Sequence, residues 1–280
     1  MGKFFIAALL SLVGISNAFA FDVPGLKVPE SFIVDRETGA YYISNINGGP
    51  TEKNSNGFIT KLKPDGSVEA LKFVEGGRDG LLLNAPKGLL LVGDILYVTD
   101  IDEVRAFDKT TGQERGGFDL RTFAPKFLND LASDPQGYIY VTDMGTNRIF
   151  SIDTSSKVVK VLVDDKKIGS PNGIVFDEAK GRLLFVTWDS GDIFRLSRSG
   201  KVKRLFDFKF GSLDGIDLDE KGNLFVSSFT GGKVYKITRR GKVSEVATDL
   251  VTPADISLDT KKRKVLVPSF NGNRIFLLDY

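Results

Sequence analysis

Short stretches in which every second residue is hydrophobic recur along almost the whole chain, and turns rich in Gly, Asp and Asn separate them. In one unit, Gly173 to Phe176 is followed by an acidic turn and a second apolar stretch, Leu183 to Trp188. Ile193 to Leu196 and Val202 to Phe206 complete the unit. A period of two with such turns predicts four antiparallel strands joined by hairpins.

A phrase made of one variable residue, an apolar strand and an acidic turn recurs six times. Its copies read PESFIVD from Pro29, PKGLLLVGD from Pro86, LNDLASD from Leu128, PNGIVFD from Pro171, LDGIDLD from Leu213 and PADISLD from Pro253. The variable residues follow one another at spacings of 57, 42, 43, 42 and 40 residues. Such self-similarity in an all-β sequence predicts a six-bladed β-propeller of four-stranded antiparallel blades.

Because blades are arranged radially, the variable position of every copy faces one shared axis. We name this set the axial residues: Glu30, Lys87, Asn129, Asn172, Asp214 and Ala254. Four of them are oxygen donors with two formal negative charges, which suits a hard divalent cation such as Ca²⁺ or Mg²⁺. In the alternative interpretation, these groups bind only one another and water in a polar channel.

The sixth copy ends after its third strand, Ile275 to Leu278. An unpaired sheet edge invites aggregation, and the spare extended segment is Phe21 to Val28. We therefore expect the amino-terminal segment to supply the outer strand of the last blade.

The amino terminus has the pattern of a secretory signal peptide, with an apolar run from Phe4 to Val13 and a small-x-small ending at Ala20. The run is too short to span a bilayer. We expect residues 1–20 to be removed and residues 21–280 to form a single domain, secreted or periplasmic. The chain has no cysteine, which a domain of this size can do without.

Composition excludes several classes of function. The formal net charge is +2 with both signs interspersed, so no basic face for nucleic acid is expected. The absence of histidine excludes a Ser-His-Asp triad and a histidine zinc site. We expect a monomer with a small-molecule substrate or ligand in the axial pocket.

Two polar, glycine-rich insertions lengthen the first unit, Asn47 to Gly57 and Glu75 to Gly80. The first leaves the end of a second strand and should overhang the axial pocket, as a lid or rim or as a tolerated surface insertion. A second ring of positions should close the second strands at the same mouth: Asn45, Asp100, Asp143, Trp188, Ser228 and Ser269. Trp188 is either a wall of the pocket or packed between blades.

The stretches FLNDLASDPQGYIYVTDM, SPNGIVFDEAKGRLLFV and SLDGIDLDEKGNLFVSSFTGGKVYKI resemble the family of senescence marker protein, gluconolactonase and luciferin-regenerating enzyme (LRE). Diisopropylfluorophosphatase, related lactonases and NHL-repeat propellers are more distant cousins. The resemblance implies a divalent metal, Ca²⁺ in the first instance, on Glu30, Asn172 and Asp214, with Asn129 added in some members. It also implies that Asp214 acts as general base or nucleophile and that Asp130 supports the site.

Three positions depart from the family pattern. Ser31-Phe32 follows the glutamate where enzymes of the family carry Gly-Pro, and Phe127 stands where sugar-lactone members carry an arginine. Lys87 would repel a dication or neutralise a carboxylate if it points inward; otherwise it leans out or binds an anionic substrate group. We place Lys87, Phe127, Trp188 and Asp255 in the substrate pocket.

Two functions follow from this pattern. The first is a metal-dependent hydrolase of a lactone or similar ester, and the second is a non-catalytic propeller that binds a ligand or a protein. The fold does not separate them, because propellers host both.

Overall fold

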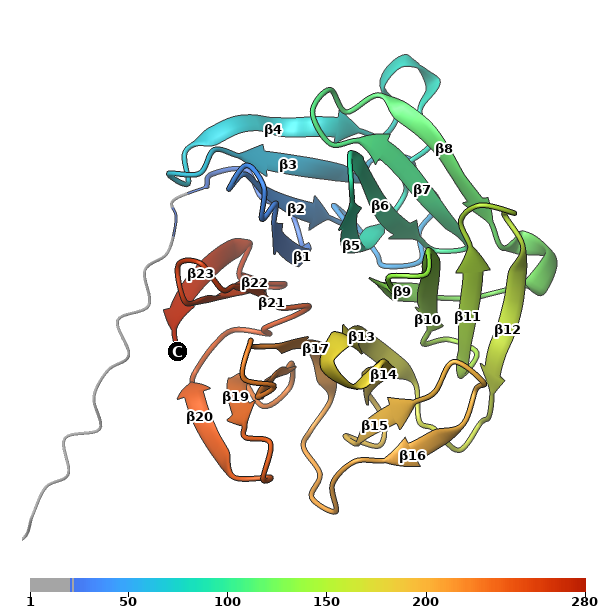
Figure 1. Cartoon of the computed structure of the whole chain (residues 1–280). Coiled ribbons are helices and arrows are strands. Elements are labelled where there is room, and N and C mark those ends of the chain that lie inside the picture. The colour runs from blue at the N-terminus through green and yellow to red at the C-terminus, as the bar shows by residue number, and fades with distance from the viewer. Residues whose placement is uncertain (1–20, 22) are drawn as a thin grey trace, which may run out of the picture.

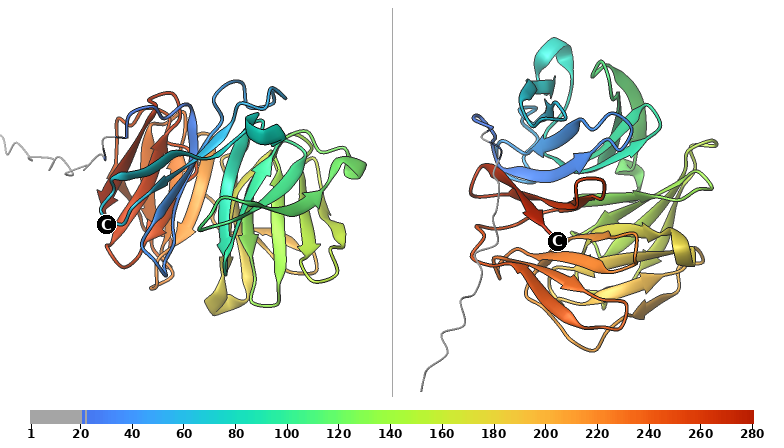
Figure 2. Two further views of the ribbon diagram at one scale, coloured as in Figure 1. Left: turned by 90° about the horizontal axis from the view of Figure 1, so that it is seen from above. Right: turned by 60° about the vertical axis from the view of Figure 1, so that its left-hand side comes forward.

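The computed structural model describes residue 21 and residues 23–280, which form six small sheets around a central axis (Figure 1). In each sheet the strands follow one another in chain order and pair antiparallel. Figure 2 shows from two further sides how the sheets stand next to one another as blades. The predicted six-bladed propeller is confirmed. The predicted signal peptide, residues 1–20, lies outside the described residues.

The first three blades have four strands each. Blade 1 contains β1 (Pro29–Val34), β2 (Tyr41–Asn45), β3 (Phe58–Leu62) and β4 (Val68–Glu75). Blade 2 contains β5 (Pro86–Val92), β6 (Ile95–Asp100), β7 (Glu103–Asp108) and β8 (Glu114–Asp119). Blade 3 contains β9 (Leu128–Ser133), β10 (Tyr138–Asp143), β11 (Arg148–Asp153) and β12 (Val159–Asp164).

Blades 4 and 5 repeat this arrangement, and blade 6 is shorter. Blade 4 contains β13 (Pro171–Asp177), β14 (Arg182–Thr187), β15 (Ile193–Leu196) and β16 (Val202–Arg204). Blade 5 contains β17 (Leu213–Leu218), β18 (Leu224–Ser228), β19 (Lys233–Ile237) and β20 (Val243–Ala247). Blade 6 contains β21 (Ser257–Asp259), β22 (Lys264–Ser269) and β23 (Arg274–Asp279).

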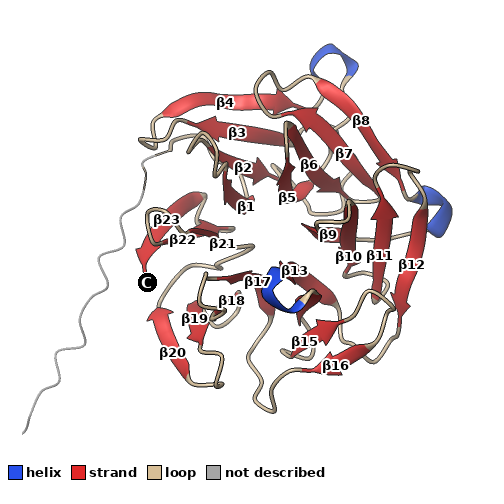
Figure 3. Ribbon diagram, in the orientation of Figure 1, coloured by secondary structure: helices blue, strands red, loops and turns tan. Residues whose placement is uncertain are grey.

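Three single-turn 3₁₀ helices interrupt the connections in the described residues, and Figure 3 colours them blue. They are η1 (Arg78–Gly80), η2 (Arg121–Phe123) and η3 (Glu178–Lys180). The first lies in the predicted insertion Glu75 to Gly80.

The acidic turn of the repeat has a structural cause. The carboxylate after an inner strand accepts hydrogen bonds from backbone N–H groups of the turn, as Asp134 does from Gln136 at 2.9 Å and Tyr138 at 3.1 Å. Asp219 does the same with Lys221 at 3.0 Å and Asn223 at 2.8 Å. These carboxylates satisfy N–H groups that the hairpin leaves unpaired.

Six hydrophobic clusters hold the blades together, each formed by the facing surfaces of two consecutive blades. Between blades 3 and 4, for example, Tyr140 and Ile149 pack with Phe185 and Leu196. Blades 6 and 1 are joined in the same way, by Leu266 and other residues around Tyr41. The ring is thus closed by packing between its first and last blades.

The expected fourth strand of blade 6 is not seen in the described residues. Gly25 has a left-handed φ of 94° and lies in a turn, so the chain from residue 23 to 28 forms no strand. Val23 and Leu26 instead pack into the cluster between blades 6 and 1, beside Ile275. Closure of the ring by an amino-terminal strand stays a prediction, and the packing of this segment against both end blades is what the structure shows.

Candidate axial site

Equivalent backbone positions carry the axial residues in all six blades. The residue before each axial residue pairs with the residue that ends the second strand: Pro29 with Asn45, Pro86 with Asp100, Leu128 with Asp143, Pro171 with Thr187, Leu213 with Ser228 and Pro253 with Ser269. In blades 1 to 5 the axial residue belongs to the inner strand, and a β-bulge shifts the pairing just after the first pair. A bulge re-aims the side chain at that point. The sequence therefore predicted the register of the axial residues correctly.

The glycines after the axial residues are required because the inner strands approach one another closely. A Cβ atom at Gly173 would lie 2.4 Å from the carbonyl oxygen of Asp214, and one at Gly215 would lie 2.2 Å from the backbone nitrogen of Ile256. No side chain fits in that space. The Asn-Gly and Asp-Gly pairs of the repeat thus combine a polar axial group with the closest possible approach of the next blade.

Buried hydroxyl groups tie neighbouring inner strands together. Thr142 of β10 accepts a hydrogen bond from the backbone N–H of Asp130 at 3.0 Å and donates one to the carbonyl of Asn172 in the next blade at 2.7 Å. Ser227 makes the same bond to the carbonyl of Ala254 at 2.7 Å. The sequence analysis missed these residues, although a Ser or Thr recurs one position before the end of several second strands. They fix the backbone that carries the axial side chains.

The second ring of predicted residues caps the loops that lead into the inner strands. Asp100 accepts N–H groups of Asn84 and Ala85, both at 2.8 Å, and Asp143 accepts the N–H of Phe127 at 2.9 Å. The remaining caps are Asn45, Ser228 and Ser269. In blade 4, Thr187 ends the strand. Trp188 was therefore placed one residue off in this register, because the sequence does not mark where β14 ends.

Trp188 belongs to a different ring, formed by the residue that follows each second strand. We name it the apolar collar: Ile46, Ile101, Met144, Trp188, Phe229 and Phe270. The ring of Trp188 lies 5.0 Å from that of Phe229, which lies 5.5 Å from that of Phe270. Each collar residue comes directly after a second-strand residue that pairs with the residue before an axial residue. The collar therefore surrounds the axis at the end where the inner strands start. A role for Trp188 in binding substrate stays a prediction.

Four axial oxygen atoms are buried and have no hydrogen-bond partner in the described structure: Glu30 Oε2, Asn129 Oδ1, Asn172 Oδ1 and Asp214 Oδ1. They belong to the four residues that the sequence analysis assigned to a metal. A buried acceptor without a partner costs about 1–3 kcal/mol, so four at one place need a common explanation. A bound cation would satisfy all of them at once.

The carboxylates alone would be too few for a metal site. Among the described residues, no three His, Cys, Asp or Glu side chains come together in a group that could hold a metal ion. Any cation at the axis must therefore use the amide oxygens of Asn129 and Asn172 beside Glu30 and Asp214. Amide oxygens are ordinary ligands of Ca²⁺ but poor ligands of Zn²⁺.

Burial disfavours the charged form of every carboxyl group near the axis. Desolvation, followed by repulsion from Asp255, raises the pKa of Glu30, Asp130 and Asp214 well above the ordinary range. Desolvation also raises the pKa of Asp255 to about 7, although a hydrogen bond from Ser31 at 2.6 Å opposes the shift. The site as described has more negative charge than it can stabilise, and a cation would compensate for it.

Asp130 links two of the inner strands that carry axial residues, and its role as a support for the site stays a prediction. Its Oδ1 accepts the N–H of Leu131 and its Oδ2 accepts the N–H of Ile174 in blade 4, both at 2.7 Å. Asp130 thereby joins the strand that carries Asn129 to the strand that carries Asn172. With both oxygens engaged, it holds two candidate ligands in position.

Lys87 is fully buried and forms no ion pair with residue 21 or residues 23–280. Its ammonium group donates a hydrogen bond to the carbonyl of Ala85 at 3.0 Å and lies 4.6 Å from the centre of the half-buried Phe127 ring. Burial lowers the pKa of Lys87 to about 8, while the charges of Glu30 and Asp100 act in the opposite direction. Two of the three positions that depart from the family pattern, Lys87 and Phe127, thus contact one another.

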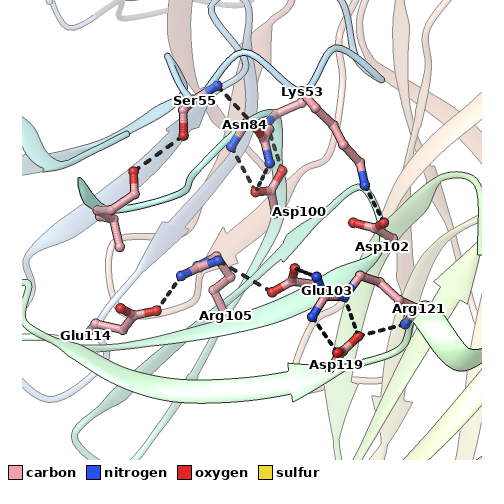
Figure 4. Close-up of polar contacts among 12 residues, drawn as sticks. Lys53, Ser55, Asn84, Asp100, Asp102, Glu103, Arg105, Glu114, Asp119 and Arg121 are labelled. Atoms are coloured by element: carbon pink, nitrogen blue, oxygen red, sulfur yellow. Dashed lines mark hydrogen bonds and ion pairs between the residues drawn. The ribbon is translucent and has the colours of Figure 1, made fainter. Parts of the chain in front are cut away.

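The insertion Asn47 to Gly57 lies along the mouth side of blade 2. Lys53 forms an ion pair with Asp102 at 2.5 Å, and the N–H of Ser55 donates to the Asn84 side chain, which in turn donates to Asp100 (Figure 4). These contacts tie the insertion to the turn beside the strand that carries Lys87. These contacts favour the interpretation of the insertion as a rim of the axial site over its interpretation as a tolerated surface insertion.

A cavity of about 480 Å³ approaches the axis from the other end. Its walls come from the later residues of the inner strands and from the turns after them, including Asp35, Arg36 and Glu178. Asp130 and Asp255, each next to an axial residue in the sequence, also line this cavity. Asp255 therefore lies below the axial ring, away from the collar.

The sequence is too distant from characterised proteins for one relative to identify it. No protein with a curated description matches the sequence. Among solved structures, a protein of unknown function from Bacteroides thetaiotaomicron is 14% identical over 94% of this chain and 72% of its own, with a TM-score of 0.73. These values establish the similarity of the fold.

Two lyase structures have the same fold. An inactive histidine-to-alanine variant of virginiamycin B lyase from Staphylococcus aureus, solved with quinupristin, is 15% identical over 94% of this chain and 98% of its own, with a TM-score of 0.66. A streptogramin B lyase is 16% identical over 94% and 86% of the two chains, with a TM-score of 0.64.

The match to a family model assigns the chain to a family, which the similarity to single structures does not do. The SMP-30/gluconolactonase/LRE-like region matches residues 28–257, which include every axial residue. The resemblance stated from the repeat motifs is thereby confirmed, and the chain belongs to the SMP-30/gluconolactonase/LRE-like family.

Proposed function

We propose that the protein is a hydrolase of a lactone or a similar ester and that it works with a divalent cation, Ca²⁺ in the first instance, at the axis. The observation that carries this proposal is the set of four buried oxygen atoms without partners on Glu30, Asn129, Asn172 and Asp214. Family membership supports it, because the same residues match the family's ligand positions.

The donor set fits the ion in number and charge. Two carboxylates balance a dication, and two amides add neutral oxygen ligands. A cation bound there would polarise an ester carbonyl. Asp214 has a second carboxylate oxygen with which it would take the proton of an attacking water, and Asp130 would keep Asn129 and Asn172 in position.

The likeness to the lyases is one of fold. The solved virginiamycin B lyase was made inactive by replacing one histidine, and this chain contains no histidine. No residue of this chain can therefore supply the imidazole that the variant lacks. Catalysis in this protein would depend on carboxylates, lysine or an ion.

The cation is tested first on the purified mature protein. Mass spectrometry should find a divalent metal, or calcium titration should raise the melting temperature. Asp214→Asn should weaken calcium binding, because it removes one of the two balancing charges. Asp207→Asn, an exposed carboxylate away from the axis, is the matched control.

Hydrolysis is tested separately with uncharged lactones such as δ-valerolactone. We expect turnover that a chelator abolishes and calcium restores. Calcium binding without turnover across a panel of lactones and esters would instead indicate a binding propeller. The absence of both would contradict the proposal.

A further inference from the structure

Lys87 differs from the other buried lysines of this protein. Three lysines are buried in the described part of the chain: Lys61, Lys87 and Lys109. Lys61 pairs with Glu69 at 3.0 Å, and Lys109 pairs with Asp35 at 3.2 Å and Glu37 at 2.7 Å. For Lys87, the described residues provide no carboxylate oxygen within 4.0 Å.

A buried cation without a counter-ion is unusual, because desolvation of a charge is costly unless it is paired. Carboxylates are near, since the charge of Glu30 acts on Lys87 more strongly than that of any other group. Yet the ammonium group is held by the carbonyl of Ala85 and the ring of Phe127. Neither partner supplies a full negative charge.

The uncompensated charge lies beside the candidate ligands. Lys87 is the axial residue between Glu30 in blade 1 and Asn129 in blade 3. If a cation takes the oxygens of Glu30 and Asp214, those carboxylates are no longer available to balance Lys87. An anionic group of a bound molecule would then be its counter-ion.

Phe127 contacts the ammonium group of Lys87 and offers a route to it. The ring lies over the ammonium group, while the Phe127 residue itself is only half-buried at the mouth. Rotation of this one side chain would uncover Lys87 without moving a strand. A cation–π contact is weaker than a charge-assisted hydrogen bond to a carboxylate, so an anionic ligand can displace the ring.

We infer that Lys87 determines specificity by binding a carboxylate on the substrate, so that the preferred substrate is a lactone or ester that carries a carboxylate beside the bond to be hydrolysed. This inference rests on the proposed function in that it assigns the substrate class of the same axial site. Phe127 covers Lys87 when no ligand is bound.

The test uses two ring ethers that cannot be hydrolysed, tetrahydrofuran-2-carboxylate and its uncharged carboxamide. Both have the size of a five-membered lactone. Calorimetry on the calcium-loaded protein should show that the carboxylate binds at least about tenfold more tightly than the amide, which is about 1.4 kcal/mol. Lys87→Met should reduce that ratio to about one by removing the cation, and Lys87→Arg should retain a preference for the carboxylate.

Lys61→Met is the matched control, because Lys61 is also buried and lies 5.0 Å from an aromatic ring centre, that of Phe73, but pairs with a carboxylate away from the axis. It should leave the ratio unchanged. A wild-type protein that binds both probes equally would overturn the inference, and this comparison requires no variant to fold. A preference that persists in Lys87→Met would also overturn it, because the carboxylate would then be bound by the calcium ion.

Failure of this inference and failure of the proposed function give different results. Hydrolysis of uncharged lactones with no preference between the probes would leave the proposed function intact and remove the role of Lys87. A preference that depends on Lys87, without calcium binding or hydrolysis, would contradict the proposed function and leave Lys87 as the carboxylate-binding residue of a binding propeller.

Discussion

Single residues at the axis determine how stability depends on pH. Burial raises the pKa of Glu30, Asp130 and Asp214, and that of Asp255 to about 7. In the unfolded chain these groups titrate near 4. The folded, metal-free protein therefore binds more protons than the unfolded chain between these pKa values.

It follows that the metal-free protein should lose stability as the pH rises from about 4 through 7. The stabilising contribution of the protonated carboxyl groups is complete below the unfolded pKa and disappears as they ionise. Calcium should counteract this loss, because it binds the ionised form. Chemical denaturation at pH 5 and pH 8, with chelator and with calcium, measures both effects. Equal metal-free stability at the two pH values would show that the axial carboxylates are not buried as described.

The identities of the axial residues could be predicted from the sequence because the repeat fixes their register. Glu30, Asn129, Asn172 and Asp214 each stand at the same position of a copy, and the structure leaves one oxygen of each without a partner. Contacts between side chains of different repeat copies could not be predicted from the repeat. The position of the Phe127 ring over Lys87 depends on a loop between blades, and no periodicity describes it.

At the scale of the strand, hydroxyl groups of one blade position the axial residue of the next. Thr142 has both its donor and its acceptor capacity in use, toward Asn172 and Asp130. Blade 4 carries the buried Val186 at the equivalent position, so a valine fits there sterically.

Thr142→Val should therefore cost about 1–3 kcal/mol, because it leaves one backbone N–H and one carbonyl buried without partners. The size of the side chain is nearly unchanged, and cavity formation should contribute little. Urea unfolding of the variant measures the loss. Thr122→Val, which alters an exposed threonine of η2 outside these strands, is a control for the substitution itself. A Thr142→Val protein as stable as the wild type would show that the tie between blades 3 and 4 is dispensable.

The strands themselves were predictable because alternation of side chains and Asp- and Gly-rich turns are local features. The positions at which strands end depend on contacts with neighbouring blades, and the sequence predicted these positions less well. The prediction for Trp188 missed by one residue because β14 ends at Thr187, an end that the sequence does not mark. At Gly25 the described chain makes a turn, and closure of the ring by an amino-terminal strand stays a prediction.

For the whole molecule, the junction between blade 6 and blade 1 completes the ring. Val23 and Leu26 from the amino-terminal segment are buried in it with residues from both blades. Because blade 6 has three strands in the described structure, its two junctions, with blades 5 and 1, have less sheet to support them than the other four.

Leu26→Ala should cost about 2–5 kcal/mol, as expected for a buried leucine, and deletion of residues 21–27 should cost more. Differential scanning calorimetry measures both changes. Leu82→Ala, at a leucine with 58% exposure, is the matched control and should have little effect. If the deletion leaves melting temperature and solubility unchanged, the amino-terminal segment does not contribute to closing the ring.

The four candidate ligands come from blades 1, 3, 4 and 5, and each pair is separated by at least one blade junction. A cation bound to all four would connect segments that are otherwise about forty residues apart or more in the chain. Local fraying of one blade would then release the ion as readily as complete unfolding. Amide hydrogen exchange should consequently slow together in β1, β9, β13 and β17 when calcium binds, so that the ion joins four of the six sheets into one cooperative unit.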